Sequence, residues 1–597
     1  MIEEHELKDI PYGIADFRDF RIKNLYYIDK TRFIRNIEKK GSFLFFIRPR
    51  RFGKSLFLSM LEYYYDIDRK DQFDFLFNGA DIQRNPTKEK NKYLVLSFNF
   101  SAVAPDKSNL GEFFLQHIRD SIGYFLDKYG KYLDIDIREA QKKFESSKGA
   151  SALMGTFLNY FRGKEYKLYV IIDEYDNFAN TILSDSGEEE YRAITQGEGF
   201  LRSFFNVIKA GTTGSDTPIS RLFMTGVSPI TLDDVTSGFN IGTNISLDLD
   251  IDEILGFTAS EVETIIEYYR QTGKIRHSTP ELMDIMNQWY NHYKFALRST
   301  SEVFNTVLVL YFLREYLKES RIPDQLIDNN ARIDYMKLRY LIISDKKGTP
   351  ASQTNGNFFK LRYIIETGSV HSKIAASFPV EELTDPTNFI SLLYYFGLLT
   401  VRGIDDEDTP VLAIPNETIK RLYYDYFRAT YNETGTLILD TDTYDKLLNG
   451  MAYKGNWQAF IDYIAQKMEA SLSLRDLLNS EKAHQVFWNV YAGLSTLYNV
   501  YSEKEMNQGF CDLVLEPLLA NRPGMKYSYL IELKYIRPSD FEKEDATERI
   551  QALRLEAESQ LNRYSLDEKF RKSIGQTTLK KLVLIFSGNR MVHHSEI

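Results

Sequence analysis

The 597-residue sequence predicts an α/β protein in three successive parts, residues 1–255, 256–435 and 436–597. The first part alternates apolar, β-rich runs with helical patterns, which is typical of βαβ units that build a parallel sheet with helices on both faces. The second part has long helical patterns and few strand signals. The third part contains two strand-like runs, a long polar helix and a last apolar run, which indicates a second α/β unit.

The composition is that of an ordinary globular chain. Hydrophobic residues make up 43% and charged residues 26%, and 40 Tyr with 41 Phe supply material for large cores. A net charge of -10 argues against a surface that coats nucleic acid as a whole, but not against a local basic groove. The single cysteine, Cys511, excludes an intrachain disulfide and a Cys-based zinc cluster. An acidic N-terminus, without any apolar run of about 18–20 residues, predicts a cytoplasmic protein without a membrane segment.

Four short apolar runs in the first part are the expected strands: residues 43–47, 93–100, 168–172 and 222–225. Helical patterns at residues 56–65 and 110–129 separate them. Strands separated by helices of this length are expected to lie parallel in one sheet.

The first of these runs leads directly into Arg48-Pro-Arg-Arg-Phe-Gly-Lys-Ser55. A strand, a tight loop and a helix opening with Lys and Ser form a P-loop, whose backbone N–H groups surround the phosphates of a nucleotide. The Lys meets the outer phosphate oxygens and the Ser hydroxyl reaches Mg²⁺. The usual pattern has a glycine at the place of Arg48, so the match is incomplete by itself. The candidate nucleotide ligands are Arg50, Arg51, Phe52, Gly53, Lys54 and Ser55, and Ser55 is also a candidate Mg²⁺ ligand.

A nucleotide site also needs a carboxylate at the end of a neighbouring strand. The run at residues 169–172 delivers Asp173 for the metal and Glu174 as candidate general base. The strand at residues 222–225 ends in Thr225, whose hydroxyl is a candidate sensor of the γ-phosphate; an ordinary capping threonine is the alternative. Together with the loop, these residues predict a Mg²⁺–ATP site of the P-loop NTPase type.

The middle part begins with Thr258-Ala-Ser-Glu261, which has the pattern of a capping box at the start of a helix. Helical patterns follow at residues 261–270, 280–293 and 303–317. Residues 398–401 and 411–414 are a candidate small hairpin of the winged-helix kind.

The third part carries a second acid-rich centre. Metal-dependent phosphodiester cleavage needs two carboxylates converging on Mg²⁺ and a Lys that orients or deprotonates water and steadies the phosphate. Glu532 and Lys534 share one face of the strand expected at residues 529–535, and Asp512 precedes the strand expected at residues 514–517. If these strands pair, Asp512 meets Glu532, which predicts both as metal ligands and Lys534 as their catalytic partner. The pattern alone is weak, because any exposed strand edge can carry it.

Several motifs together resemble the bacterial AAA-ATPase-like family, whose members commonly carry a C-terminal PD-(D/E)XK nuclease-type domain. The loop of that family typically reads Arg-Pro-Arg-Arg-Phe-Gly-Lys-Ser, so the resemblance makes Arg48 a family trait. The motifs lie at residues 11–14, 27–31, 48–55, 172–176, 225–228 with 237–240, and 289–295.

The resemblance extends to the third part, and it implies a restriction-endonuclease-like fold there. Ser502-Glu503, Gly509 and Asp512 match the approach to the nuclease hairpin, and Gln560-X-X-X-Tyr564 matches the Gln-X-X-X-Tyr signature of the exonuclease branch. Gln560 and Tyr564 share a helix face and are therefore candidate catalytic residues in one groove. The chain departs from the family where Phe510 or Cys511 stands in place of the usual Arg, and where Glu-Leu-Lys replaces the frequent Glu-Phe-Lys.

These observations favour an ATP-binding switch coupled to a Mg²⁺-dependent nuclease that cleaves DNA or RNA. The resemblance implies ATP and Mg²⁺ as cofactors and nucleic acid as partner of the third part. The alternative is a nucleotide-regulated binding or signalling protein whose nuclease-like domain binds nucleic acid or a partner without cleaving. A small-molecule phosphotransferase is disfavoured, since nothing after Asp176 resembles an acceptor site.

Five further side chains have weaker claims. A homo-oligomer with an arginine finger is compatible with the sequence, and the candidate fingers are Arg202 and Arg221. Glu503 or Glu505 could add a carboxylate on the metal side, although a solvated loop acid is favoured. His484 could approach the metal, although a structural histidine is favoured.

Overall fold

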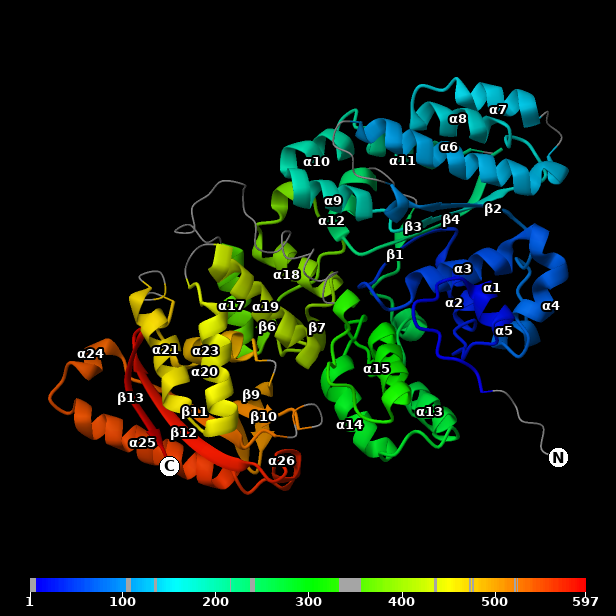
Figure 1. Ribbon diagram of the computed structural model, residues 1–597. Helices are drawn as coiled ribbons and strands as arrows, with labels where there is room; N and C mark the ends of the chain where they lie inside the picture. The colour runs from blue at the N-terminus through cyan, green and yellow to red at the C-terminus, as the bar shows by residue number, and fades with distance from the viewer. Residues whose placement is uncertain are drawn as a thin grey trace, which may run out of the picture. The chain divides into compact units, whose positions relative to one another are not determined.

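A computed structural model (Figure 1) describes most of the chain in two compact units. One unit comprises Met1–Lys347 with Ser369–Ile419, and the other comprises Gly348–Gly368 with Lys420–Ile597. The predicted boundaries after residues 255 and 435 stay predictions. The residues described are 7–103, 109–133, 137–214, 216–236, 242–331, 356–433, 437–471, 474, 477–495, 497–519, 522 and 524–597. The motif at residues 237–240 lies outside them.

The first unit is built on a parallel sheet with strand order β2-β3-β4-β1-β5. Because helices cover both of its faces, its central strands are apolar runs, and β3 is buried along its whole length. The predicted parallel sheet is confirmed, with the two-residue strand β5 added. The strands are β1 (Phe43–Ile47), β2 (Leu94–Asn99), β3 (Leu168–Asp173), β4 (Ile219–Gly226) and β5 (Thr243–Asn244).

Helices lie on both faces of this sheet. Figure 1 shows α6, α8 and α11 on one face and α1, α2 and α3 on the other. The helices of this part are α1 (Phe17–Ile22), α2 (Phe33–Lys40), α3 (Lys54–Tyr65), α4 (Phe73–Leu76), α5 (Asp81–Arg84), α6 (Leu110–Tyr129), α7 (Ile137–Glu145), α8 (Ala150–Asn159), α9 (Asn177–Ser186), α10 (Glu188–Thr195), α11 (Phe200–Ala210) and α12 (Pro229–Thr236).

The remainder of the first unit is mainly helical. Thr258 and Glu261 form the predicted capping box at the start of α13, and Ser278 with Glu281 forms a second one at the start of α14. The predicted hairpin is present as β7 and β8, and β6 adds a third antiparallel strand. The elements are α13 (Ala259–Arg270), α14 (Thr279–Tyr290), α15 (Thr306–Glu319), β6 (Ser369–His371), α18 (Pro386–Tyr395), β7 (Thr400–Ile404) and β8 (Pro410–Ala413).

The second unit is a mixed sheet with strand order β13-β12-β11-β10-β9. Strands β10 and β11 pair antiparallel, as the sequence predicted, and β11 pairs with β12 in parallel. Helix α25 covers an apolar cluster that includes Val514, Leu530 and Leu561. The strands are β9 (Tyr498–Met506), β10 (Gly509–Pro517), β11 (Tyr527–Tyr535), β12 (Thr578–Ser587) and β13 (Arg590–Glu596).

The helices of the second unit lie on both faces of this sheet, with α20 and α23 opposite α25 in Figure 1. They are α17 (Gly356–Thr367), α20 (Thr441–Lys454), α21 (Trp457–Ala470), α23 (Glu481–Ala492), α24 (Pro538–Phe541), α25 (Ala546–Tyr564) and α26 (Glu568–Ser573), and α19 (Glu417–Glu433) begins just before the division of the chain at residue 420. Among the described residues, no helix combines the length and apolar character needed to cross a membrane.

Candidate functional site

The loop of residues 48–53 begins where β1 ends and leads into α3. Arg51 and Gly53 have positive φ values of 70° and 99°, a left-handed conformation that glycine adopts without steric cost. Gly53 is the N-cap of α3, which begins at Lys54. The unpaired N–H groups of the first turn of α3 therefore lie at the loop, an arrangement that attracts phosphate.

Three predicted side chains meet at the carboxyl end of the parallel sheet. The hydroxyl of Ser55 donates to Oδ2 of Asp173 at 2.6 Å, and the hydroxyl of Thr225 donates to Oδ1 of the same carboxylate at 2.7 Å. Parallel strands bring their carboxyl ends to one edge, which explains the convergence. The oxygens of Ser55 and Asp173 are hard donors of the kind Mg²⁺ prefers, so the donor chemistry fits this metal.

Lys54 is buried beside this cluster. Its ammonium donates to the carbonyl oxygens of Arg48 at 3.0 Å and Pro49 at 2.9 Å. Burial lowers the pKa of Lys54, and the negative charges of Glu174 and Asp173 act in the opposite direction. The ammonium of Lys54 therefore lies at the loop and, among the described residues, has no hydrogen bond to an acid. A lysine in this position is suited to contact a phosphate.

Glu174 follows Asp173 in a strained backbone conformation, with φ at 50°. Burial raises its pKa, while Lys54 opposes the shift and Asp173 adds to it. A carboxyl group in these surroundings suits the predicted role in orienting or deprotonating water. That role stays a prediction.

The remaining loop side chains point to protein partners. Arg50 donates to Oδ1 of Asn177 at 3.1 Å, and Arg51 donates to the carbonyl of Asn330 at 3.3 Å. Phe52 is 1% exposed, so only its backbone is available to a nucleotide from the solvent side.

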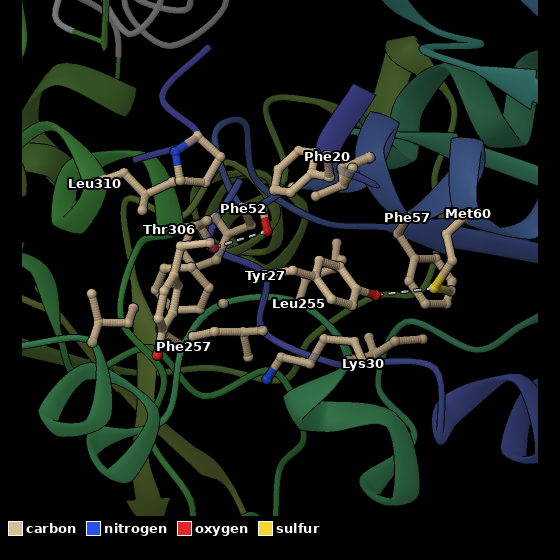
Figure 2. Close-up of a pocket in the computed structure, with 18 residues that line it drawn as sticks. Phe20, Tyr27, Lys30, Phe52, Phe57, Met60, Leu255, Phe257, Thr306 and Leu310 are labelled. Atoms are coloured by element: carbon tan, nitrogen blue, oxygen red, sulfur yellow. Dashed lines mark hydrogen bonds between the residues drawn. The ribbon is translucent and has the colours of Figure 1, made fainter. Parts of the chain in front are cut away.

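An apolar pocket lies next to the loop and α3 (Figure 2). The polar side chains in its wall are engaged: the Tyr27 hydroxyl contacts Sδ of Met60 at 3.6 Å, and Lys30 pairs with Glu261 at 2.8 Å. The pocket therefore suits a flat apolar group. Its wall includes Pro11, Tyr27, Phe52, Leu56, Phe57 and Phe257.

In the second unit, the predicted acids and lysine converge. The register of β10 and β11 sets Leu513 opposite Ile531, which brings Asp512 beside Glu532. Oδ2 of Asp512 accepts from the N–H of Leu533 at 2.8 Å, and Nζ of Lys534 lies 3.7 Å from Oε2 of Glu532. All three predicted residues are nearly buried, at 7%, 1% and 6% exposed for Asp512, Glu532 and Lys534.

The electrostatics of this centre favour a bound cation. Burial raises the pKa of Glu532, and the neighbouring carboxylate of Asp512 raises it further. Burial also raises the pKa of Asp512. Two buried carboxylates that share one place repel each other, and a divalent cation relieves that repulsion. The carboxylate oxygens of Asp512 and Glu532 are hard donors, which fit Mg²⁺. Among the described residues, no group of three or more His, Cys, Asp or Glu side chains is arranged to hold a metal ion.

Residues 11–236 match the family described as "Predicted AAA-ATPase", and residues 479–596 match the PD-(D/E)XK nuclease superfamily. The chain joins an AAA-ATPase-like domain to a PD-(D/E)XK nuclease superfamily domain. It is also 28% identical over 334 residues to an "Uncharacterized protein in vnfD 5'region" of Azotobacter chroococcum mcd 1, an alignment that covers 54% of this chain and 56% of that relative. A Walker-type ATPase of Pyrococcus abyssi is structurally similar at a TM-score of 0.36 and 10% identity, covering 71% of this chain and 99% of the other.

Sequence reasoning gave no role to Asp176 of the AAA-ATPase-like domain. Its buried Oδ2 accepts from the N–H groups of Val227, at 2.9 Å, and Ser228. Gly226 is required beside it, because a Cβ there would lie 2.5 Å from Oδ1 of Asp176. Asp176 therefore fixes the end of β4 and with it the position of Thr225. The only sequence feature that pointed to Asp176 was its position three residues after Asp173 in the same motif.

Two residues of the nuclease superfamily domain were missed. Gln485 on α23 donates to Oδ1 of Asp512, so it orients that carboxylate. Glu481 is the first residue of the same helix. Burial raises its pKa; the charge of Lys534 opposes this shift and the charge of Asp512 adds to it, both less strongly than burial acts. The sequence contained no signal for which face of this helix meets β10.

The structure separates the two members of the Gln-X-X-X-Tyr signature. Gln560 lies one helical turn after Glu556, whose carboxylate is 3.3 Å from Lys534. Tyr564 is 2% exposed and belongs to the apolar cluster under α25. The structure thus places Tyr564 in the core, packed against Gly509. Its catalytic role, like that of Gln560, stays a prediction.

Three of the five weaker candidates have identifiable partners. His484 stacks on Phe586 with ring centroids 4.2 Å apart and donates from Nε2 to the carbonyl of Gly588 at 2.9 Å, and burial lowers its pKa to about 4. Glu503 pairs with Lys482. Arg221 lies near the start of β4, the end opposite Thr225, and donates to the Tyr93 hydroxyl at 3.2 Å. Arg202 lies on α11 and Glu505 is exposed on β9. Cys511 is buried in the apolar cluster.

Replacing Gly509 with Ala is expected to destabilise the protein by about 1–3 kcal/mol, because the added Cβ would overlap the buried side chain of Tyr564. That Cβ would lie 2.6 Å from the hydroxyl oxygen of Tyr564 and 2.8 Å from its ring. Urea denaturation measures the change. Gly524→Ala is the matched control, since its Cβ would make an ordinary 3.8 Å contact with Tyr453, and we expect a change within about 0.5 kcal/mol. Equal effects of the two substitutions would contradict the proposed contact.

Proposed function

We propose that this protein binds Mg²⁺–ATP in its AAA-ATPase-like domain and uses that site to regulate Mg²⁺-dependent cleavage of DNA or RNA in its nuclease superfamily domain. The observation that carries the proposal is the juxtaposition of Asp512 and Glu532, with Lys534 3.7 Å from Glu532, inside a domain of the PD-(D/E)XK nuclease superfamily. Two carboxylates and a lysine are the side chains that phosphodiester hydrolysis needs at one point.

At the nucleotide site, Ser55 and Asp173 would hold Mg²⁺, which would neutralise negative charge on the phosphates. Lys54 would meet the outer phosphates, and Thr225 keeps Asp173 oriented through its 2.7 Å hydrogen bond. Glu174 is the candidate that orients the attacking water. The apolar pocket beside Phe52 and Leu56 supports a nucleotide with a flat base, because stacking and burial on apolar walls favour such a group (Figure 2).

At the nuclease site, Asp512 and Glu532 would hold Mg²⁺, which would act as a Lewis acid on the scissile phosphate. Gln485 orients Asp512, and the N–H of Leu533 donates to the other oxygen of that carboxylate. Burial alone would lower the pKa of Lys534, but Glu481, Glu532 and Asp512 more than offset this effect and raise it. Lys534 is therefore a cation at neutral pH, suited to orient water and to balance phosphate charge.

The proposal is tested with the full-length protein, in Mg²⁺ or Mn²⁺, on linear, circular and single-stranded DNA and on RNA, each with and without ATP. We expect metal-dependent degradation of at least one substrate and a change in its rate on adding ATP. Binding of a nucleic acid without any degradation would instead support the alternative, a nucleotide-regulated binding protein. Degradation that ATP leaves unchanged would contradict the regulatory part of the proposal.

A further inference from the structure

Arg48 takes the place of the first glycine of the usual phosphate loop, yet its guanidinium is buried between two aromatic rings. Its Cζ lies 4.5 Å from the ring centroid of Phe46 and 4.4 Å from that of Phe295. Nη1 donates to the carbonyls of Ile47, at 3.1 Å, and Ser246. The side chain is 1% exposed, so it is packed in the interior and is not free to reach a bound phosphate from the solvent side.

Burial of a guanidinium costs desolvation free energy, and in Arg48 few hydrogen bonds offset that cost. Nε and Nη2 are buried without a hydrogen-bond partner in the part of the chain that the structure describes. The faces of Phe46 and Phe295 supply cation–π attraction in place of those bonds. Burial lowers the pKa of Arg48 to about 10, so the group still carries its charge at neutral pH. An apolar side chain would fill the same volume at lower cost, which points to a role for the charge.

The backbone at position 48 does not require glycine. Its N–H donates to the carbonyl of Gly226 at 3.2 Å and so continues the β1–β4 ladder, and Arg48 is not among the residues with positive φ. The conformational freedom of a glycine is therefore unused here. Position 48 therefore accommodates an arginine. Its side chain reaches Phe295, which lies in the helical part of the unit that follows the sheet in sequence.

The rest of the loop is held by the same region. Gly397, at φ 72°, packs so closely that a Cβ would lie 2.8 Å from Cγ of Pro49. The ring of Phe52 stands edge-on to Tyr293 and Phe295, with centroids 4.9 and 5.2 Å apart. These contacts fix the loop between Pro49 and Phe52 from one side.

Backbone hydrogen bonds add to this hold. The N–H of Val307 donates to the carbonyl of Arg51 at 3.2 Å, and the Thr306 hydroxyl donates to that of Phe52, also at 3.2 Å. The N–H of Gly256 reaches the Phe52 carbonyl as well, at 3.4 Å. The carbonyls of Arg48 and Pro49 in turn accept from Lys54. The position of the Lys54 ammonium thus depends on how firmly residues 48 and 49 are held.

We propose that Arg48 is a positioning residue for the phosphate-binding loop: its guanidinium ties the loop to Phe295 and thereby sets the Lys54 ammonium and the loop N–H groups for phosphates. The inference rests on the proposed binding of ATP at this loop. This role of Arg48 accounts for the aromatic motif at residues 289–295. The sequence alone gave that motif no role at the nucleotide site.

The test is Arg48→Gly, which restores the glycine of the usual pattern. We expect ATP affinity to fall about tenfold or more, because a loosened loop must be ordered at the expense of binding energy. Affinities are measured by displacement of a fluorescent ATP analogue with ATP and with AMP. AMP depends less on the part of the loop that holds the outer phosphates, so its affinity is expected to fall less, and the ratio of ATP to AMP affinity drops. Unchanged or improved ATP binding would overturn the proposal.

Two further variants keep the test decisive if Arg48→Gly does not fold. Arg48→Lys keeps a cation between the rings and is expected to retain more ATP affinity than Arg48→Met, which keeps only the apolar stem. Arg69→Met is the matched control: it removes a cation 5.5 Å from the Tyr63 ring, away from the loop, and is expected to leave ATP affinity unchanged. Equal ATP affinities for Arg48→Lys and Arg48→Met, or equal losses for ATP and AMP, would overturn the positioning role. Absence of ATP binding by the wild type would instead refute the proposed function.

Discussion

Replacing Glu532 with Gln is expected to abolish metal-dependent cleavage while making the metal-free protein more stable. The neutral amide that replaces the carboxylate is a poor ligand for a divalent cation, and loss of such electrostatic stabilisation lowers the rate by about 10²–10³-fold or more. The same change removes one of two buried acids that repel each other. Activity and metal-free stability should therefore move in opposite directions, which a general disruption of the fold would not produce.

The pH dependence of the wild type follows from the same pair of acids. Burial, and then the charge of Asp512, raise the pKa of Glu532 in the folded state above the ordinary value of 4.5. The folded protein then holds its proton more tightly than the unfolded chain does. The stability of the metal-free protein should therefore fall as the pH rises above about 4.5, until the pH passes the raised pKa. Glu532→Gln lacks this titration, so its advantage over the wild type should grow over that range.

Thermal unfolding with and without Mg²⁺ measures both effects. A metal bound only by the folded state stabilises the wild type by about 2.7 kcal/mol at one hundred times its Kd, and Glu532→Gln should lose most of that gain. Glu548→Gln, a change at an exposed acid on α25, is the control and should keep cleavage and metal response. Cleavage retained by Glu532→Gln would show that the reaction occurs elsewhere. A metal response without cleavage on any substrate would favour the non-cleaving alternative.

The elements that the sequence predicted well are those whose pattern is local. Strands β1 and β3 are short apolar runs followed directly by candidate site residues, and α6 has the predicted bounds. Strands β9 and β13 were missed because they lie at the edges of the sheet and carry charged and polar residues such as Glu503 and His593. Strand β5, at two residues, is too short to leave a periodic signal.

The candidate sites divide in the same way. Asp512, Glu532 and Lys534 lie on neighbouring antiparallel strands, so their proximity follows from strand pairing and could be predicted. The orienting contact of Gln485 depends on how α23 docks on the sheet, which no local pattern determines. The burial of Arg48 depends on Phe295, which is remote in sequence and meets it only in the folded chain. Tyr564 was predicted at the groove because helical spacing gives it a shared face with Gln560, whereas its burial in the apolar cluster depends on how α25 packs on the sheet.

Replacing Lys54 with Met is expected to weaken nucleotide binding strongly with only a modest loss of stability. Its ammonium is buried and donates to the carbonyls of Arg48 and Pro49, while Glu174 and Asp173 favour its charge without a hydrogen bond to it among the described residues. A charged hydrogen bond to phosphate contributes about 1.5–3 kcal/mol, which corresponds to a loss of ATP affinity of about 10–100-fold. The free energy of unfolding without nucleotide should fall by only about 1–3 kcal/mol, because Met fills the same space but leaves the carbonyls of Arg48 and Pro49 without this donor.

Lys128→Met is the matched control, because it removes another buried lysine of the same unit with different surroundings. Nζ of Lys128 lies 2.8 Å from Asp66, whose side chain is fully buried, and 3.4 Å from Glu62. Breaking a buried ion pair from one side costs about 3–5 kcal/mol, since the remaining carboxylate loses its counter-charge. We therefore expect Lys128→Met to unfold at lower urea concentration yet to bind ATP with unchanged affinity while folded. If both variants lost stability and affinity together, Lys54 would be a structural lysine like Lys128, and the loop would not be the nucleotide site.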